Sequence, residues 1–543
     1  MSSLLYTVIT AVPEGLGVMG LIVLIILTIT TLDLLRRLFS DASLPRNLPW
    51  AGTGGRKDPL SIAKANLRSF FRLKNLLAEG YTKYSKNDQT YVLPYFINGP
   101  QVILPPSQIP WLMEQPEDVL NQERVNRQFL QADYAFFHAN LVEGPVHPEI
   151  IQHQLTKKLD SFADDIVDEA RASLEDSWGV DTEAWREVSV YDTVLHIISR
   201  LSVRVLMGPP LCRDGAFLFI CSNFIRKVAL AAAAISLFPW FLQPIVAPIF
   251  TLYDRFLYLR CRSHLMPIIH ERLEQVQKKK KDTTESKTPS NDYVEWAISH
   301  ALAKPIPNPT ELDPRVIAGR LAVLAFAMIQ SSVITLTNAL FDIAASPGCV
   351  ETLAAMREDV LRETGGKGQT RWGKMALSRM TRVDSALRES LRLNGFIERG
   401  IMKMVVAPEG VTLPDGSHIP YGVKVGVSGY SIHHDEDNYR DATRFDALRF
   451  IQEGGTGKRA QGFVNTSEKF MGFSHGSHAC PGRFFATHQL KIALGHIALL
   501  YDIEPTAQRP ENEWFFGHIA PPLTATLRVR RRKAQELSRG ERL

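Results

Sequence analysis

The chain has 543 residues, of which 45% are hydrophobic and 22% charged, so it is globular and long enough to bury a large core. Its five cysteines are odd in number and lack paired spacing, which excludes a disulfide framework and favours a reducing compartment. The net charge of +5 is modest, and much of it lies at residues 278–281 and 530–533. A solvated loop and a solvated tail explain these clusters more simply than nucleic-acid binding, so we expect no nucleic-acid partner.

The N-terminal region carries a membrane signal. Residues 15–32 contain no charge and are rich in Leu, Ile and Val, which is long enough for one spanning helix. Only Glu14 is charged before it, whereas Arg36 and Arg37 follow it, so the positive-inside rule places the rest of the chain in the cytoplasm. A cleaved signal peptide is the alternative, but no basic region or small-residue cleavage site supports it.

The rest of the chain reads as mainly α with a small β-sheet region. Helical periodicity covers residues 62–77, 150–206, 313–345, 383–394 and 484–499, and alternation predicts strands at 90–93, 101–104 and 401–421. We expect five parts: a short segment 1–14, a transmembrane anchor 15–35, a Pro/Gly hinge 36–57, one catalytic domain 58–530 and a polar tail 531–543.

Residues 217–258 are unusually apolar, and Pro239, Pro244 and Pro248 argue against a second spanning helix. Two interpretations remain open at this point. One is a buried pair of core helices; the other is a surface that dips into the membrane and admits an apolar substrate.

The predicted helix 313–345 is apolar on all sides except for a short polar patch that includes Gln330 and Ser331. Such a helix must be buried on most sides, so the patch needs partners. The two side chains either bond carbonyls within the helix or serve chemistry, since a hydroxyl can pass a proton and an amide can orient water.

Two further stretches hold charged side chains at suggestive positions. Glu389 and Arg392 are three residues apart on one predicted helix face and can form an ion pair. About sixty residues later, Arg449 lies in the sequence Phe-Asp-Ala-Leu-Arg-Phe. The spacing of Glu389 and Arg392 is common on solvated helices, so it is a weak signal by itself.

The last motif is a Gly-punctuated loop, residues 470–486, with Cys480 immediately before a predicted helix. Backbone N–H groups at a helix N-terminus favour negative charge, so we expect a lowered pKa for this thiol, and thiolate is the form that ligates iron. An ordinary buried cysteine is the alternative.

The order of these motifs resembles cytochrome P450 from about residue 58 to 530. The loop Phe473-x-x-Gly476-x-His478-x-Cys480-x-Gly482 resembles its haem-binding loop, in which the thiolate is the axial ligand of the metal. Gln330 and Ser331 stand where the family has an acid and a threonine that supply protons, so the carboxylate is missing here. Within the family, the anchor and the loop are similar to those of fungal microsomal members of secondary metabolism.

The resemblance implies roles for these residues. Glu389, Arg392 and Arg449 would form a structural triad; Phe473, Gly476, His478 and Arg399 would contact haem b, with His478 and Arg399 at its propionates. The basic contact expected on an early helix has no clear match, and His147 and His153 are unassigned candidates. Arg483 and Lys491 would lie on the face where an acidic reductase docks.

The implied function is a haem-thiolate monooxygenase of the endoplasmic reticulum membrane. It would oxidise a lipophilic, terpenoid- or polyketide-like molecule with O₂ and electrons from NADPH through NADPH–cytochrome P450 reductase, with cytochrome b5 as an additional candidate donor. Two alternatives stand beside it. The departure at Gln330 and Ser331 suggests a P450-fold isomerase, dehydratase or ring-closing enzyme, and a non-catalytic haem sensor or carrier is the third hypothesis.

Overall fold

The computed structural model describes residues 18–55, 58–136, 146–281, 291–304, 308–364, 372–396, 398–452, 462–515 and 518–533. The expected segment 1–14, the start of the anchor and residues 534–543 of the expected tail lie outside this part of the chain.

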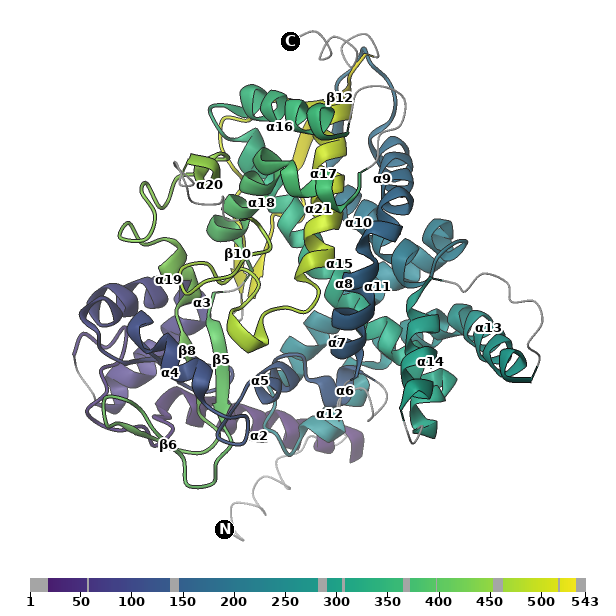
Figure 1. Cartoon of the computed structure of the whole chain (residues 1–543). Coiled ribbons are helices and arrows are strands. Elements are labelled where there is room, and N and C mark those ends of the chain that lie inside the picture. Colours follow the sequence, from purple (N-terminus) through teal and green to yellow (C-terminus); the bar gives the residue numbers. More distant parts are fainter. Residues whose placement is uncertain are drawn as a thin grey trace.

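Helices form most of the described structure (Figure 1). They are α2 (Val18–Phe39), α3 (Pro59–Lys83), α4 (Ile109–Glu114), α5 (Gln122–Phe129), α6 (Ala132–Ala135), α7 (His147–Ile150), α8 (Thr156–Lys158), α9 (Ala163–Trp178), α10 (Val190–Leu206), α11 (Gly215–Ser236), α12 (Gln243–Phe250), α13 (Leu252–Lys281), α14 (Tyr293–Ala303), α15 (Pro314–Ala344), α16 (Cys349–Thr364), α17 (Lys374–Arg379), α18 (Thr381–Asn394), α19 (Gly429–His433), α20 (Arg449–Gln452) and α21 (Arg483–Leu500).

Small sheets lie at the edges of this helical body. The largest has the order β1-β2-β8-β5-β3, where β2 and β8 are parallel and the other neighbours antiparallel. The strands are β1 (Tyr91–Leu93), β2 (Gln101–Ile103), β3 (Leu120–Asn121), β4 (Arg186–Ser189), β5 (Gly400–Val405), β6 (Val411–Thr412), β7 (His418–Ile419), β8 (Lys424–Val427), β9 (Tyr501–Ile503), β10 (Glu513–Phe515), β11 (His518–Ala520) and β12 (Thr526–Arg531). The mainly α prediction with a small β region is confirmed.

The helix α15 runs through the centre of the molecule and packs against α10, α18 and α21 (Figure 1). Its apolar sequence explains this position, because a helix that is hydrophobic on all sides is stable only when other elements surround it. It starts sharply: Asp313 caps its first turn by accepting a hydrogen bond from the N–H of Arg315 at 2.8 Å, and Pro314 occupies the first helical position.

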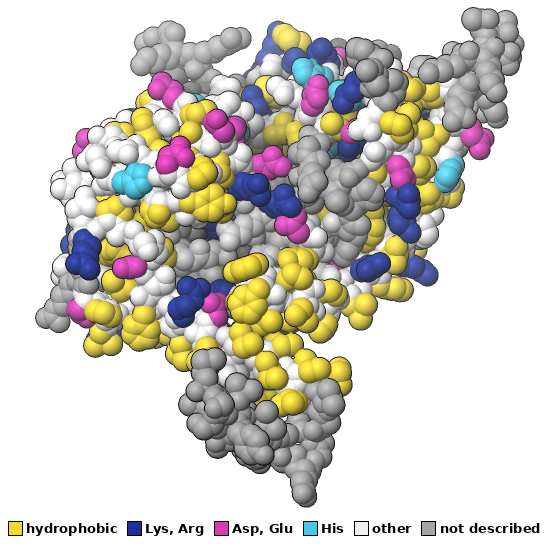
Figure 2. All heavy atoms as spheres, turned by 90° about the horizontal axis from the view of Figure 1, so that it is seen from below, with side chains coloured by type: hydrophobic (Ala, Val, Ile, Leu, Met, Phe, Trp, Pro, Cys, Tyr) yellow, Lys and Arg dark blue, Asp and Glu magenta, His cyan; other side chains and the backbone are white. Residues whose placement is uncertain are grey.

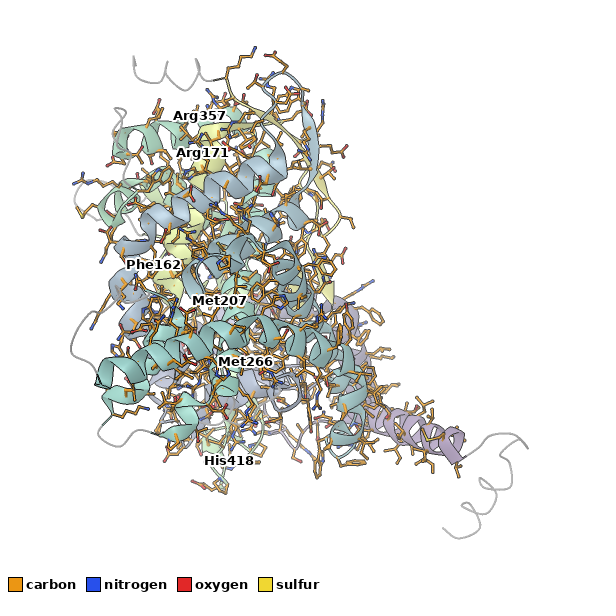
Figure 3. All side chains as sticks on the ribbon, turned by 90° about the vertical axis from the view of Figure 1, so that its right-hand side faces the viewer. Phe162, Arg171, Met207, Met266, Arg357 and His418 are labelled. Atoms are coloured by element: carbon orange, nitrogen blue, oxygen red, sulfur yellow. The ribbon has the colours of Figure 1, made fainter. Side chains whose placement is uncertain are left out.

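The N-terminal helix α2 is long and apolar enough to cross a membrane, and only 6% of its most hydrophobic window is buried. Two other helices, α11 and α15, also meet the length and composition of a span, but 50% and 72% of their windows are buried in the protein. Seen from the side in Figure 3, the purple α2 extends away from the body of the protein. The helix α13, which carries Met266, instead packs against that body. The structure therefore favours α2 alone as the membrane span.

The apolar stretch 217–258 combines both of the interpretations left open by the sequence. One face of α11 is buried, including Phe217, Phe224 and Val228. Large apolar side chains near α12 are nevertheless exposed: Trp240 (80%), Ile245, Ile249 (71%), Leu252 and Phe256. On the underside of the molecule, hydrophobic side chains gather around the base of the projecting segment (Figure 2).

The basic cluster at 530–533 differs from the solvated tail that we expected. Arg530 and Arg531 belong to β12, which pairs with β9, and Arg531 forms an ion pair with Glu175 at 2.8 Å. Arg532 pairs with Asp502 at 3.0 Å, and Lys533 with Glu183 at 2.8 Å. Carboxylates distant in the sequence thus pair with the cluster, which is part of the folded domain.

Candidate active site

The loop before α21 closes on itself through backbone hydrogen bonds. The N–H of Cys480 donates to the carbonyl of Phe473 at 2.8 Å, and that of Ala479 donates to the carbonyl of Gly476 at 3.1 Å. The Arg483 guanidinium donates to the carbonyl of Cys480 at 2.9 Å. These bonds hold the sulfur of Cys480 three residues ahead of the helix.

Two glycines of the loop are required by close packing. Gly476 has φ +68°, and a Cβ there would lie 1.9 Å from Cε of Met113. A Cβ at Gly472 would lie 2.6 Å from Cδ2 of Leu391. Real carbon atoms never approach so closely, so side chains at these positions would displace the loop that carries Cys480.

The pKa expected for Cys480 was wrong in direction. Burial raises the pKa of the thiol, and the backbone N–H groups of Gly482 and Arg483 oppose this rise without overcoming it. Desolvation disfavours the charged form of a thiol, and the sulfur lies deep enough for this effect to exceed that of the N–H groups. The positive charge of Arg483 also opposes the rise in the pKa of the thiol.

On α15 the polar patch lies on a turn with unusual exposure for a central helix. Ala327 is exposed and Ser331 is partly exposed, although most neighbours on the helix are buried. The Ser331 hydroxyl donates to the carbonyl of Ala327 at 2.8 Å, which leaves its lone pairs available as acceptors.

Gln330 points toward a different element. Burial raises the pKa of Tyr191 on α10, and the guanidinium of Arg226 and a hydrogen bond from Gln330 oppose the rise. The Gln330 Oε1 atom is buried and has no hydrogen-bond partner among the described residues. An unsatisfied buried amide oxygen is costly, so this position suits an ordered water.

The structure brings Glu389, Arg392 and Arg449 together. Two guanidinium nitrogens of Arg392, Nε and Nη2, donate to the Glu389 carboxylate at 2.7 and 2.8 Å, and Nε of Arg449 donates to the same carboxylate at 2.9 Å. The side chains of Glu389 and Arg392 have no exposed surface. The remaining N–H groups of the two arginines bind carbonyls of residues 433–444, so the network ties α18 to the segment before the Cys480 loop.

The two residues expected at haem propionates both contact protein carboxylates. Nε2 of His478 lies 2.6 Å from the carboxylate of Glu117, which also lies 3.8 Å from Nζ of Lys403. Arg399 donates to Glu398 at 2.6 Å and to Gln101 at 3.0 Å. Each of these two side chains therefore already has a carboxylate partner within the protein. Local sequence carried no signal for Glu117 as the partner of His478, whereas Glu398 directly precedes Arg399 in the chain.

Other candidates are less favourably placed. His147 is partly buried near Arg320, and desolvation of its ring lowers its pKa to about 4, whereas His153 is exposed. Lys491 is wrong as a docking residue, because its side chain is 3% exposed and pairs with Asp384 at 2.6 Å. Its position on α21 faces α18 rather than solvent.

Comparison with known proteins decides the family. The cytochrome P450 family model matches residues 141–528. The chain belongs to the cytochrome P450 family. It is 32% identical to the cytochrome P450 monooxygenase polB of Polytolypa hystricis, over 90% of this chain and 94% of that protein. It is 33% identical to cytochrome P450 monooxygenase 151 of Postia placenta, over 89% of this chain and 93% of that protein.

The fold agrees with this assignment. The crystal structure of the cytochrome P450DA haem domain superposes with a TM-score of 0.66 at 15% identity, and the match covers 90% of this chain and 98% of that one. The P450 fold and the monooxygenase class predicted from the sequence are thus confirmed, and the relatives are fungal P450 monooxygenases.

The P450 family implies a haem cofactor, and the residues present fit one. A single thiol lies in a closed loop with backbone N–H groups beside it. The helix α15, which packs against α21, carries an exposed Ala327 and a partly exposed Ser331 among otherwise mostly buried neighbours. Among the described residues no cluster of three His, Cys, Asp or Glu could hold a metal ion.

Proposed function

We propose that this P450 inserts one atom of O₂ into a C–H or C=C bond of a lipophilic small molecule of terpenoid or polyketide type, in secondary metabolism. The supporting observation is that the closed thiol loop immediately precedes α21, while one partly exposed hydroxyl, that of Ser331, lies on α15, and these two helices pack together. Electrons would come from NADPH through a separate cytochrome P450 reductase, with cytochrome b5 as an additional donor to test.

Haem b ligated by Cys480 would supply the redox chemistry needed to activate O₂. The side chains that would hold it are Cys480 at the metal, Phe473 at the loop, and His478 and Arg399 at the propionates. The contacts of His478 with Glu117 and of Arg399 with Glu398 support this role, because a haem propionate is a carboxylate as well. Gly476 would keep the loop close to α4.

Ser331 and Gln330 on α15 would have different roles in proton transfer. Ser331 presents a hydroxyl at a partly exposed position, and Gln330 has a free amide oxygen that can hold a water molecule. Ser331 is the side chain of this pair that can pass a proton, and Gln330 orients its source.

Coupled turnover separates the monooxygenase from the alternatives. The P450 is expressed with a fungal reductase and supplied with candidate terpenoid and polyketide precursors under ¹⁸O₂. The proposal predicts product that contains one ¹⁸O atom and consumption of NADPH and O₂ that depends on substrate. Product formed without O₂ would support the isomerase, dehydratase or cyclising alternative. Haem binding without any turnover across the precursor panel would support a sensor or carrier.

The ligand is tested directly by Cys480→Ala. This variant should lose the thiolate Soret band of the ferrous–CO complex. Cys349→Ala is the matched control, because Cys349 is also a free, buried cysteine but lies on α16. Retention of the thiolate spectrum by Cys480→Ala would contradict the assignment.

The role of Ser331 is tested with three variants. Ser331→Ala should lower product formed per NADPH roughly tenfold or more, with hydrogen peroxide released instead, because proton transfer by a positioned group contributes about 10²–10⁴-fold. Ser331→Thr should keep most coupling. Ser332→Ala is the control, since Ser332 is buried on the same helix. Equal coupling in Ser331→Ala and the parent would remove the role of Ser331.

We also propose that the P450 is a single-pass protein of the endoplasmic reticulum membrane with its catalytic domain in the cytoplasm. The span α2 and the basic pair Arg36 and Arg37 in its last turn support this orientation. Protease added to intact microsomes should digest the catalytic domain, whereas protection of the domain would contradict the orientation.

A further inference from the structure

The last turn of α2 is fastened to the catalytic body by one buried cation. The Arg37 guanidinium donates to the carbonyls of Ile97 at 2.7 Å, Ser236 at 3.0 Å and Phe238 at 3.2 Å. Its Nε donates to Asp33, one turn earlier, at 2.7 Å. The Arg37 side chain is 14% exposed, whereas that of its neighbour Arg36 is 73% exposed.

The acceptors of Arg37 lie at a particular place in the fold. Ser236 is the last residue of α11, and the carbonyls at a helix C-terminus have no partner within the helix and carry partial negative charge. Arg37 satisfies the carbonyls of Ser236 and Phe238 at once, because its planar guanidinium presents several donors in a fixed fork. Asn66 on α3 reinforces the contact from the other side by donating to the carbonyl of Leu38 at 2.8 Å.

The end of α11 is in turn connected to α15 through α6. Nε2 of Gln131 donates to the hydroxyl of Ser236 at 3.0 Å, and both residues are buried. Gln131 begins α6, after which Phe136 packs edge-to-face on Phe326 of α15, with ring centroids 6.4 Å apart. Phe326 immediately precedes Ala327, the exposed residue of the candidate active site.

We infer that Arg37 is a positioning residue that holds the C-terminal end of α11 and, through Ser236 and Gln131, the helix α6 against α15. The last turn of the membrane anchor is thus a structural part of the wall around the site. This inference rests on the proposed function for its consequence in turnover, because loosening that wall changes how fast molecules enter and leave. The contacts themselves do not depend on any substrate.

The test compares Arg37→Met with Arg36→Met in the full-length holoenzyme in nanodiscs. Met keeps much of the apolar length of either side chain and removes its donors. Hydrogen exchange of the amides of Leu237, Phe238 and Gln243 should be about tenfold faster in Arg37→Met and unchanged in Arg36→Met, because the latter loses only an exposed pair with Asp33. Arg37→Lys should restore exchange only in part, since the donors of an ammonium lie on a single nitrogen and lack the planar fork with which the guanidinium reaches carbonyls of separate segments.

A second readout follows the site with 4-phenylimidazole, which shifts the Soret band when it binds the haem. Its dissociation rate should rise about three- to tenfold in Arg37→Met at unchanged ferrous–CO spectrum. Ser236→Ala, which removes the hydroxyl bound by Gln131, should speed exchange at residues 132–136 and leave residues 237–243 near the parent.

The outcomes separate this inference from the proposed function. Equal exchange in Arg37→Met and Arg36→Met overturns the inference. Faster exchange without any change in the dissociation rate overturns its consequence for the site. Failure of every variant and the parent to bind 4-phenylimidazole contradicts the haem site instead. If Arg37→Met lacks haem, the comparison of Arg37→Lys with Arg36→Lys gives the same readouts.

Discussion

At the scale of single residues, this P450 buries charged side chains that are held by ion pairs and hydrogen bonds. Glu389 is the centre of one such network, since its two oxygens serve both Arg392 and Arg449. Removing one partner from a buried network leaves the remaining charges unpaired, which costs far more than the network contributes relative to an apolar core.

We expect Glu389→Gln to destabilise the folded protein by about 3–5 kcal/mol, because it leaves two buried guanidinium groups without a carboxylate. The measurement is the midpoint temperature for loss of the ferrous–CO signal, together with haem content after expression. Asp441→Asn is a suitable control, because Asp441 is 66% exposed and its pair with Arg440 spans 3.8 Å. Similar midpoints for the two variants would contradict a structural role for the triad.

Histidines behave differently, because several are held neutral. His433 accepts a hydrogen bond from the N–H of Met471 at 2.9 Å through Nε2, and its ring stacks on Phe470. Burial, together with the positive charge of neighbouring arginines, lowers its pKa to about 3.

The folded state therefore binds a proton at His433 less readily than the unfolded state does. Stability is fully present above the unfolded pKa of about 6.5 and is lost as the pH falls toward 3. At pH 5 the loss should be about 2 kcal/mol from this residue. His433→Gln keeps an acceptor for Met471 and should reduce the drop in midpoint temperature between pH 7 and pH 5. An unchanged drop would show that His433 titrates normally.

At the scale of elements, the membrane side of the P450 is built from α2 and the exposed apolar residues around α12. On the underside of the molecule, hydrophobic side chains gather around the base of the projecting segment (Figure 2). An exposed apolar surface beside a membrane span favours contact with the lipid interface, because burial of a large apolar side chain is worth about 1.5–3 kcal/mol.

Deleting residues 1–32 should therefore weaken membrane binding without abolishing it, and retaining Asp33 and Arg37 preserves the contacts with α11. Adding Trp240→Gln and Ile249→Gln should then lower partition into vesicles roughly tenfold or more. Val350→Gln with Met375→Gln is the control, because both residues are exposed but lie on α16 and α17. The measurement is flotation with vesicles; equal partition for the two pairs would exclude this surface.

At the scale of the whole molecule, the proposed function predicts that a reductase delivers electrons at a surface near the Cys480 loop. Lys491 cannot contribute to steering, because its charge is buried against Asp384. Arg483 contacts the carbonyl of Cys480, so altering it would disturb the ligand loop as well as the surface. Lys469 is exposed in the segment before the loop and offers a cleaner test.

Lys469→Glu should slow reduction by the reductase about three- to tenfold at low ionic strength, because surface charge acts mainly on the association rate. The difference should fade above about 0.5 M salt, where the screening length is only a few ångströms. Arg186→Glu, an exposed change on β4, is the control. Stopped-flow reduction that responds equally to both changes would place docking elsewhere.

Local patterns in the sequence determined the span, the central helix and the loop around Cys480. These features depend on periodicity, glycine spacing and a cysteine beside a helix start, all of which are local in the chain. The central helix was expected at 313–345 and occurs at Pro314–Ala344, since Asp313 and Pro314 specify its start. The candidate ligand and the positions of Gln330 and Ser331 follow from the same local order.

Tertiary structure alone decided which polar and charged side chains are already paired within the protein. The partners of His478, Lys491 and Arg37 lie far away in the sequence, so no local spacing indicates that Glu117, Asp384 or the end of α11 meets them. The pKa of Cys480 shows the same limit. The sequence predicts the helix start after Cys480. Desolvation of the thiol depends on the whole packed core, however, and this desolvation outweighs the effect of the nearby N–H groups on the pKa.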